Sequence, residues 1–148
     1  MPAESIEPDR FQRQETHLLD LEIREDGGLR LFCGHVSDTA GPLNNIECAL
    51  EPLILGLTKR LVLTAATVAE ATVYFGQWDF GLAVTGLRDA VSWLLMQRLG
   101  WERTPFSDED YRETVRVTYE RLVKDPDSIV EELTGQLNRA LGGSAPIP

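Results

Sequence analysis

The 148-residue chain has little cysteine and little basic charge, and both shortages exclude classes of protein. Cys33 and Cys48 are its only cysteines and form no CxxC pair, so a disulfide scaffold is excluded. Fourteen basic residues against 24 acidic ones give a formal net charge of -10. Because this charge repels phosphate backbones and anionic lipids, we expect no direct binding of nucleic acid or of a membrane surface.

The chain also lacks a long uninterrupted apolar run. In its most apolar region, residues 53–75, the longest stretch without charge is Leu61–Ala69, well below the ~20 residues needed to span a bilayer. The first fifteen residues contain four acidic side chains and no apolar run, which does not fit a secretory signal peptide. We therefore predict no membrane span and a cytoplasmic location.

Motifs of catalysis and of cofactor binding are missing as well. The sequence has no GxSxG, no Walker loop and no GxGxxG. His17, Cys33 and His35 share one face of a predicted hairpin, with Cys48 further along the chain, but their spacing matches no zinc motif. The prediction therefore favours a protein that is not an enzyme and has no cofactor and no metal site.

What is present is one stretch of even composition, residues 16–141, between two predicted disordered tails at 1–15 and 142–148. We interpret it as a single domain. Apolar residues at odd positions on both sides of Glu25-Asp26-Gly27-Gly28 predict a hairpin with one buried face. Since facing residues share a side of the sheet, a two-residue loop is excluded, and the favoured register sets Glu22 opposite Arg30.

Apolar residues then recur at three- and four-residue spacing over residues 50–75 and predict one long amphipathic helix. Asn44 and Glu47 are spaced as a capping box for its start. Pro52 fits its first turn or a kink, and Gly76 fits its C-terminal end. The expected apolar face consists of Leu50, Leu53, Ile54, Leu57, Leu61, Thr64, Ala65, Val68, Thr72 and Phe75.

The remaining sequence predicts one strand and three helices. Alternation over residues 78–85, ending at Gly86, indicates the strand. A short buried helix is predicted over 90–99, although residues 88–98 leave helix and strand open. Ser107 with its acidic neighbours predicts a helix whose face holds Tyr111, Val115, Thr118 and Leu122, and on which Arg112 and Arg116 would pair with Glu109, Glu113 and Glu120.

Asp125-Pro126 starts the last predicted helix, which carries an apolar stripe to Leu141. The fold class that we expect is α+β. Its small, mostly antiparallel sheet would consist of the hairpin plus one later strand, covered by the long helix, with amphipathic helices at the C-terminal end.

Two groups of residues are candidates for function. Trp78, Asp79 and Arg88 could line a pocket in which the arginine holds an anionic small molecule. The candidate interface residues lie on the long helix, where we expect them to contact a protein partner or a second copy of the chain. The reason is that three amphipathic helices have more apolar surface than about three strands can cover. These interface residues are Leu53, Leu57, Leu61 and Val68.

The segment GQWDFGLAVTGLRDAVSW, residues 76–93, and the hairpin HLLDLEIREDGGLRLFCG, residues 17–34, carry a family resemblance. Together they are similar to the C-terminal regions of larger bacterial DNA-binding proteins of the AlbA-like, Schlafen-type group. The resemblance covers about residues 16–100 and is carried by packing residues, namely Trp78, Asp79, Gly81, Gly86, Leu87 and Arg88. In that group the nucleic-acid and nucleotide functions belong to a separate N-terminal domain. The resemblance therefore implies an accessory or partner-contact domain.

From these observations the leading hypothesis is a non-enzymatic, cytoplasmic interaction or regulatory domain that acts by self-association or by docking to a protein partner. One alternative is a small-ligand-binding domain or enzyme with a pocket near Trp78, Asp79 and Arg88. A further alternative is an accessory domain of a DNA-binding system.

Overall fold

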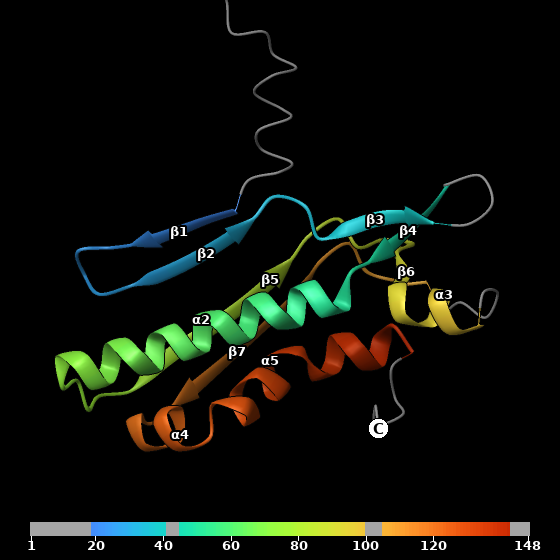
Figure 1. Ribbon diagram of the computed structural model, residues 1–148. Helices are drawn as coiled ribbons and strands as arrows, with labels where there is room; N and C mark the ends of the chain where they lie inside the picture. Colours follow the sequence, from blue (N-terminus) through green and yellow to red (C-terminus); the bar gives the residue numbers. More distant parts are fainter. Residues whose placement is uncertain (1–18, 41–44, 100–104, 143–148) are drawn as a thin grey trace, which may run out of the picture. The chain divides into compact units, whose positions relative to one another are not determined.

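The computed structural model describes residues 19–40, 45–99 and 105–142 of the chain (Figure 1). It contains small, mainly antiparallel sheets and one long helix, so the predicted α+β class is confirmed. The contacts within the chain form two compact units, Met1–Val36 and Ser37–Pro148. The predicted tails at 1–15 and from 143 onward lie outside the described residues, and the single domain over 16–141 stays a prediction.

The first unit contains the predicted hairpin, in which β1 (Leu19–Ile23) pairs antiparallel with β2 (Leu29–Cys33). Its register is the predicted one, with Glu22 opposite Arg30. The loop is longer than two residues, as parity requires, and Gly27 within it has a φ of 87°, in the left-handed region that favours glycine.

The prediction of a buried face on β1 is wrong. Leu19, Leu21 and Ile23 are 56%, 49% and 70% exposed. Within this unit the hairpin is a two-stranded ribbon, and a ribbon of two strands has no second layer to cover its apolar side. Alternation therefore identified the strand and its pairing correctly but not its burial.

The second unit contains nine described elements. In chain order these are β3 (Ser37–Ala40), β4 (Ile46–Ala49), α2 (Glu51–Thr72), β5 (Trp78–Val84), β6 (Val91–Ser92), α3 (Trp93–Leu99), β7 (Tyr111–Val117), α4 (Tyr119–Lys124) and α5 (Pro126–Ala140). β4 pairs antiparallel with β3 and parallel with β6, while β5 pairs antiparallel with β7. The later strand predicted from sequence is β5, but its partner is β7 and not the hairpin.

The helix predicted after Ser107 is wrong over its first half, which forms strand β7. Tyr111, Val115 and Val117 point to the buried side of the sheet and alternate with exposed residues, which is a period of two. A helix begins only at Tyr119, where the Thr118 hydroxyl accepts a 3.3 Å hydrogen bond from the backbone N–H of Arg121. The acidic residues after Ser107 suggested a capping box, but β-sheet pairing with β5 prevails.

Residues 88–98, left open by the sequence, contain both structures. β6 is a two-residue strand and α3 follows it directly. The buried side chain of Glu51, from the first turn of α2, accepts a 3.3 Å hydrogen bond from the backbone N–H of Leu94, and Ser92 accepts one from Leu95 at 3.1 Å. These acceptors satisfy the free N–H groups at the start of α3.

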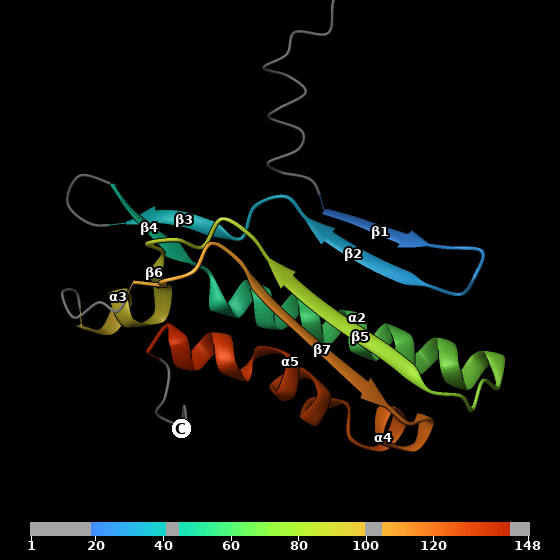
Figure 2. The same cartoon turned by 180° about the vertical axis from the view of Figure 1, so that it is seen from behind.

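The core of the second unit lies between the helices α2, α4 and α5 and the β5–β7 sheet (Figures 1 and 2). α2 packs against α4 and α5, and α5 also packs against β7 and β5. Its largest fully buried aliphatic side chains come mostly from the C-terminal helices, as the amphipathic pattern of that region predicts. They are Val62, Leu122, Ile129, Leu133, Leu137 and Leu141.

Candidate functional site

The candidate surface is built on α2, which differs from its prediction at both ends. The capping box is wrong because Glu47 lies in strand β4, where its carboxylate accepts a hydrogen bond from Ser37. Asn44 lies outside the described residues. Pro52 occupies the first turn, as one of the two sequence interpretations holds.

The C-terminal end of α2 is not at Gly76. The helix ends at Thr72, and Val73 adopts the left-handed conformation with a φ of 54°. This conformation closes the helix, since the N–H of Tyr74 bonds to the carbonyl of Ala69 at 3.0 Å. A β-branched residue is unusual there, because its side chain clashes with the following carbonyl.

The hydroxyl groups of four threonines in α2 form hydrogen bonds within the helix itself. Each donates from Oγ1 to the backbone carbonyl four residues earlier, at 2.7 to 3.0 Å. They are Thr58, Thr64, Thr67 and Thr72. Their polar groups are therefore satisfied within the helix, and the exposed charges of α2 beyond its first turn are Lys59, Arg60 and Glu70.

The buried face of α2 shares Ile54 and Ala65 with the predicted apolar face but is otherwise turned away from it. Its buried residues beyond the first turn are Ile54, Thr58, Val62, Ala65 and Ala69. The predicted interface residues each precede one of these and are only half-buried: Leu53, Leu57, Leu61 and Val68. Since successive helical residues are ~100° apart, these four form a stripe beside the packed face. We call them the α2 side stripe.

Part of α2 is left exposed by the rest of the described second unit. Its length of 22 residues, with a mean hydropathy of 1.4 over its most apolar 18-residue window, is that of a helix able to cross a membrane, a test of composition that core helices also pass. Only 28% of its most apolar window is buried, whereas a core helix is mostly buried. Leu55 and Leu63 add further exposed apolar area on the solvent side. α2 therefore has apolar surface available for contact.

An aromatic cluster follows the end of α2. Tyr74 meets Trp78 edge to face at 5.9 Å between ring centroids, and Phe75 meets Tyr119 at 4.9 Å. Trp78 stacks on Phe80 at 6.2 Å. Val73 and Phe75 remain 63% and 66% exposed, so the turn after α2 is an apolar tip next to the helix surface.

The three residues of the predicted pocket do not converge. Asp79 is the second residue of β5, whereas Arg88 lies beyond its far end, and the five strand steps from residue 79 to 84 alone span about 17 Å. Arg88 is exposed and pairs with Glu109 at 3.2 Å. Trp78 is half-buried, and its indole N–H has no acceptor among the described residues.

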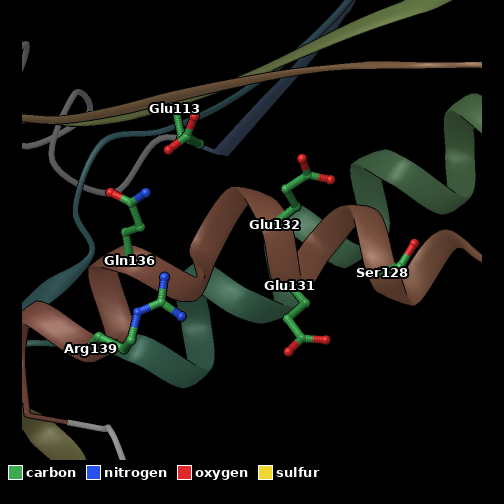
Figure 3. A pocket seen from close by; sticks show the side chains of 6 residues that line it. All are labelled: Glu113, Ser128, Glu131, Glu132, Gln136 and Arg139. Carbon is green, nitrogen blue, oxygen red and sulfur yellow. The ribbon is translucent and has the colours of Figure 1, made fainter.

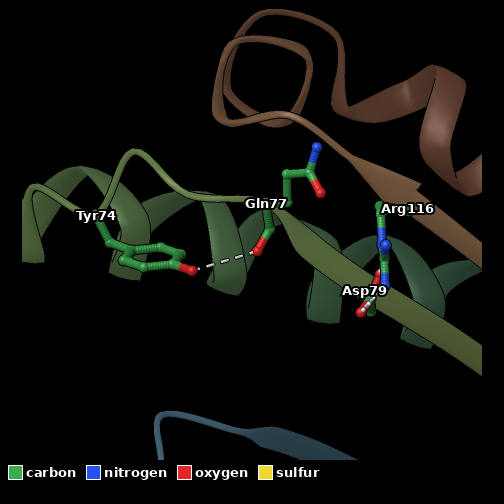
Figure 4. A network of polar contacts seen from close by, with 4 residues as sticks. All are labelled: Tyr74, Gln77, Asp79 and Arg116. Atoms are coloured by element: carbon green, nitrogen blue, oxygen red, sulfur yellow. Dashed lines mark hydrogen bonds and ion pairs between the residues drawn. The ribbon is translucent and has the colours of Figure 1, made fainter.

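Asp79 is held by Arg116 on the neighbouring strand. Arg116 donates two hydrogen bonds to its carboxylate, at 2.7 and 3.1 Å (Figure 4). These bonds lower the pKa of Asp79 and raise the pKa of Arg116. The helical ion pairs expected for Arg112 and Arg116 are therefore wrong, because both residues lie on β7 and Arg112 pairs with Asp110 at 3.5 Å.

A polar groove between β7 and α5 was not predicted. It encloses about 370 Å³ and is lined by Glu113, Ser128, Glu131, Glu132, Gln136 and Arg139 (Figure 3). Glu132 is already bound to Arg121 at 2.6 Å. The residues that line the groove include no histidine, cysteine or lysine. Predicting it required the strand assignment of β7, because Glu113 faces α5 only in a strand.

Two of the candidate metal ligands, Cys33 and Cys48, belong to different units of the chain. His17 lies outside the described residues. The thiol of Cys33 donates to the backbone carbonyl of His35 at 3.4 Å, and Cys48 is buried in strand β4 of the second unit. In residues 19–40, 45–99 and 105–142, no three histidine, cysteine or acidic side chains gather as a metal site would require.

Comparisons with family models, with curated proteins and with solved structures find no match for this chain. The resemblance to AlbA-like, Schlafen-type proteins stays an expectation from the sequence.

Proposed function

We propose that this protein is a non-enzymatic interaction module, acting in the cytoplasm, that docks a partner protein through the α2 side stripe. The observation that carries the proposal is the partial burial of Leu53, Leu57, Leu61 and Val68 on one line of α2, beside its packed face. Side chains spaced by three to four residues along a helix suit the apolar face of a second helix. The partner element is therefore an amphipathic helix.

The charge beside the stripe defines the partner further. Arg60 is exposed next to Leu57 and Leu61 and forms no ion pair within the described part of the chain, whereas Lys59 pairs with Asp127 at 3.4 Å. A free guanidinium at the rim of an apolar contact favours an acidic residue on the partner. The docked helix accordingly has an apolar face with an acidic flank.

The alternative of a small-ligand site at Trp78, Asp79 and Arg88 has less support. Both charged members already have ion-pair partners, and a ligand would have to displace Arg116 or Glu109. An accessory role beside a DNA-binding subunit, which the sequence resemblance implies, is compatible with helix docking and would supply a partner. The net charge of -10 favours contact with protein over contact with DNA.

Site-specific photo-crosslinking in cells tests the proposal. A photoreactive residue replaces Leu57, and a matched control replaces Glu131 on α5. We expect adducts from position 57 only, mapping to the apolar face of a partner helix with an acidic flank, and lost in the Leu61→Glu variant. Adducts to α2 of a second copy, or adducts that survive Leu61→Glu, would contradict heterotypic docking.

A further inference from the structure

The outer edge of β5 is a second surface, separate from the α2 side stripe. Within the part of the chain that the structure describes, β5 pairs with β7 on one side and forms no ladder on the other. No backbone hydrogen bond joins residues 78–84 to another described segment on that side. An edge strand of seven residues therefore directs alternate N–H and C=O groups away from the sheet.

This edge lacks the features that keep edge strands from pairing. β5 has no proline, lysine or arginine, and its register with β7 runs without a bulge. Its single charge, Asp79, is neutralised by Arg116 across the exposed face of the sheet. By contrast, β7 carries charged side chains at Arg112, Glu113 and Arg116. β5 is thus the unprotected edge of the two.

We infer that two copies of the chain join by antiparallel pairing of their β5 edges, which makes one four-stranded sheet across a twofold axis. A twofold contact must be self-complementary, and the sequence of β5 meets this condition when the axis passes at Gly81. Trp78 then faces Val84 of the second copy and Phe80 faces its Leu82. These residues belong to the inner side of the sheet in both copies.

The same register also separates the charges. Asp79 faces Ala83 of the second copy, so the two carboxylates do not stand opposite each other. At the axis Gly81 faces Gly81, and neither side chain hinders the approach. A two-stranded sheet is marginal alone, whereas four strands over a continuous apolar face are stable. The β5 edge of a second copy therefore matches this edge in its apolar side chains, in the separation of its carboxylates and in its twofold symmetry.

A charge-swap at the axis tests the inference. Gly81 is exposed, and a Cβ there would meet only the Thr114 methyl group at 3.9 Å, so side chains are tolerated in the monomer. In Gly81→Lys and in Gly81→Glu, like charges would face each other across the axis. Sedimentation equilibrium should show each homodimer weakened about tenfold relative to the unsubstituted protein. An equimolar mixture of the two variants should restore the dimer.

Two further measurements keep the inference falsifiable. Thr114→Lys places a charge on the same face of the sheet but on β7, and it should leave dimerisation unchanged. In hydrogen exchange, the amides of β5 should lose protection on dilution while those of β7 keep it. A monomer at every concentration, a dimer insensitive to both Gly81 variants, or β5 edge amides protected in the monomer would each overturn the inference.

The two proposed surfaces fail independently. Substitutions in the α2 side stripe should abolish the cross-links from position 57 without changing the sedimentation of the dimer. The Gly81 variants should weaken the dimer without changing the cross-links from position 57. If the unsubstituted protein shows only one of the two behaviours, the proposal for the other surface is wrong.

Discussion

The hydroxyl of Tyr111 donates a 2.6 Å hydrogen bond to the backbone carbonyl of Leu133 and ties strand β7 to the middle of α5. Both residues are buried: Tyr111 is the first residue of β7, and Leu133 lies on α5, which packs against that strand. The bond therefore fixes how the sheet, with its open β5 edge, lies on the C-terminal helix. Tyr111 was expected on a helix face, where it could not make this contact.

Replacing Tyr111 by Phe should lower the free energy of unfolding by about 1 kcal/mol at neutral pH, because the hydrogen bond is lost while the ring still packs. Urea denaturation measures the change. Tyr74→Phe, at an exposed position, is the matched control and should have a smaller effect. Equal losses in the two variants would contradict the assigned role of Tyr111.

The same residue predicts an alkaline dependence of stability. Burial, with the nearby Glu113 carboxylate as a second cause, raises the pKa of Tyr111 in the folded state. Its contribution to stability is complete below the unfolded pKa of about 10 and is lost as the pH rises through the folded value. Unfolding midpoints between about pH 8 and 11 should thus fall more steeply in the unsubstituted protein than in Tyr111→Phe. Parallel pH dependences of the unfolding midpoint in the two proteins would contradict a raised pKa of Tyr111.

Val73→Gly should raise the free energy of unfolding by about 1 kcal/mol, because glycine adopts the left-handed φ of 54° without the clash that a β-branched side chain makes. Val73 is mostly exposed, so little apolar burial is lost. Thermal and urea denaturation measure the gain. Val73→Thr keeps the branched Cβ and should bring no comparable gain. A destabilised glycine variant would show that Val73 is not strained.

Two adjacent residues of α2 test which of its faces is packed. Val62→Ala should cost about 2 kcal/mol, since Val62 is fully buried and the change leaves a cavity. Leu61→Ala removes a larger group from a half-buried site and should cost only about 1 kcal/mol. Chemical denaturation of the purified protein gives both values. The reverse order would mean that the α2 side stripe is the true core face.

Asp79 should titrate below its ordinary value of about 3.9, because the hydrogen bonds from Arg116 favour the carboxylate. A depressed folded pKa means that the contribution of the pair is present at neutral pH and is lost as the pH falls through the folded value. NMR titration of the carboxyl carbon measures it. In Arg116→Gln the pKa should return toward the ordinary value. An unchanged pKa in that variant would contradict the assignment.

Several elements were predictable because their causes are local. The hairpin register follows from parity and from the charges of Glu22 and Arg30, which face each other as expected. The starts of α2 and α5 follow from Pro52 and Pro126, which lie in the first turns of their helices. β5 was predicted by its own alternation of apolar and other residues.

Other features depend on contacts between distant residues, and the sequence pattern misled there. A helix-start pattern at Ser107 precedes β7, but pairing with β5 across some thirty residues makes the segment a strand. The interface candidates Leu53, Leu57, Leu61 and Val68 lie on the predicted helix, yet which side of it is packed depends on α4 and α5. The Asp79–Arg116 pair and the groove at Glu113 exist only because β7 is extended.

The sequence by itself determined the class of the fold, the long apolar helix and the absence of common catalytic motifs, because composition, periodicity and turn chemistry are properties of neighbouring residues. The tertiary structure decided strand partners, the orientation of α2 and the surfaces left uncovered. These depend on how helices and strands far apart in the chain share a limited amount of apolar surface, and burial is settled only when all of them are packed.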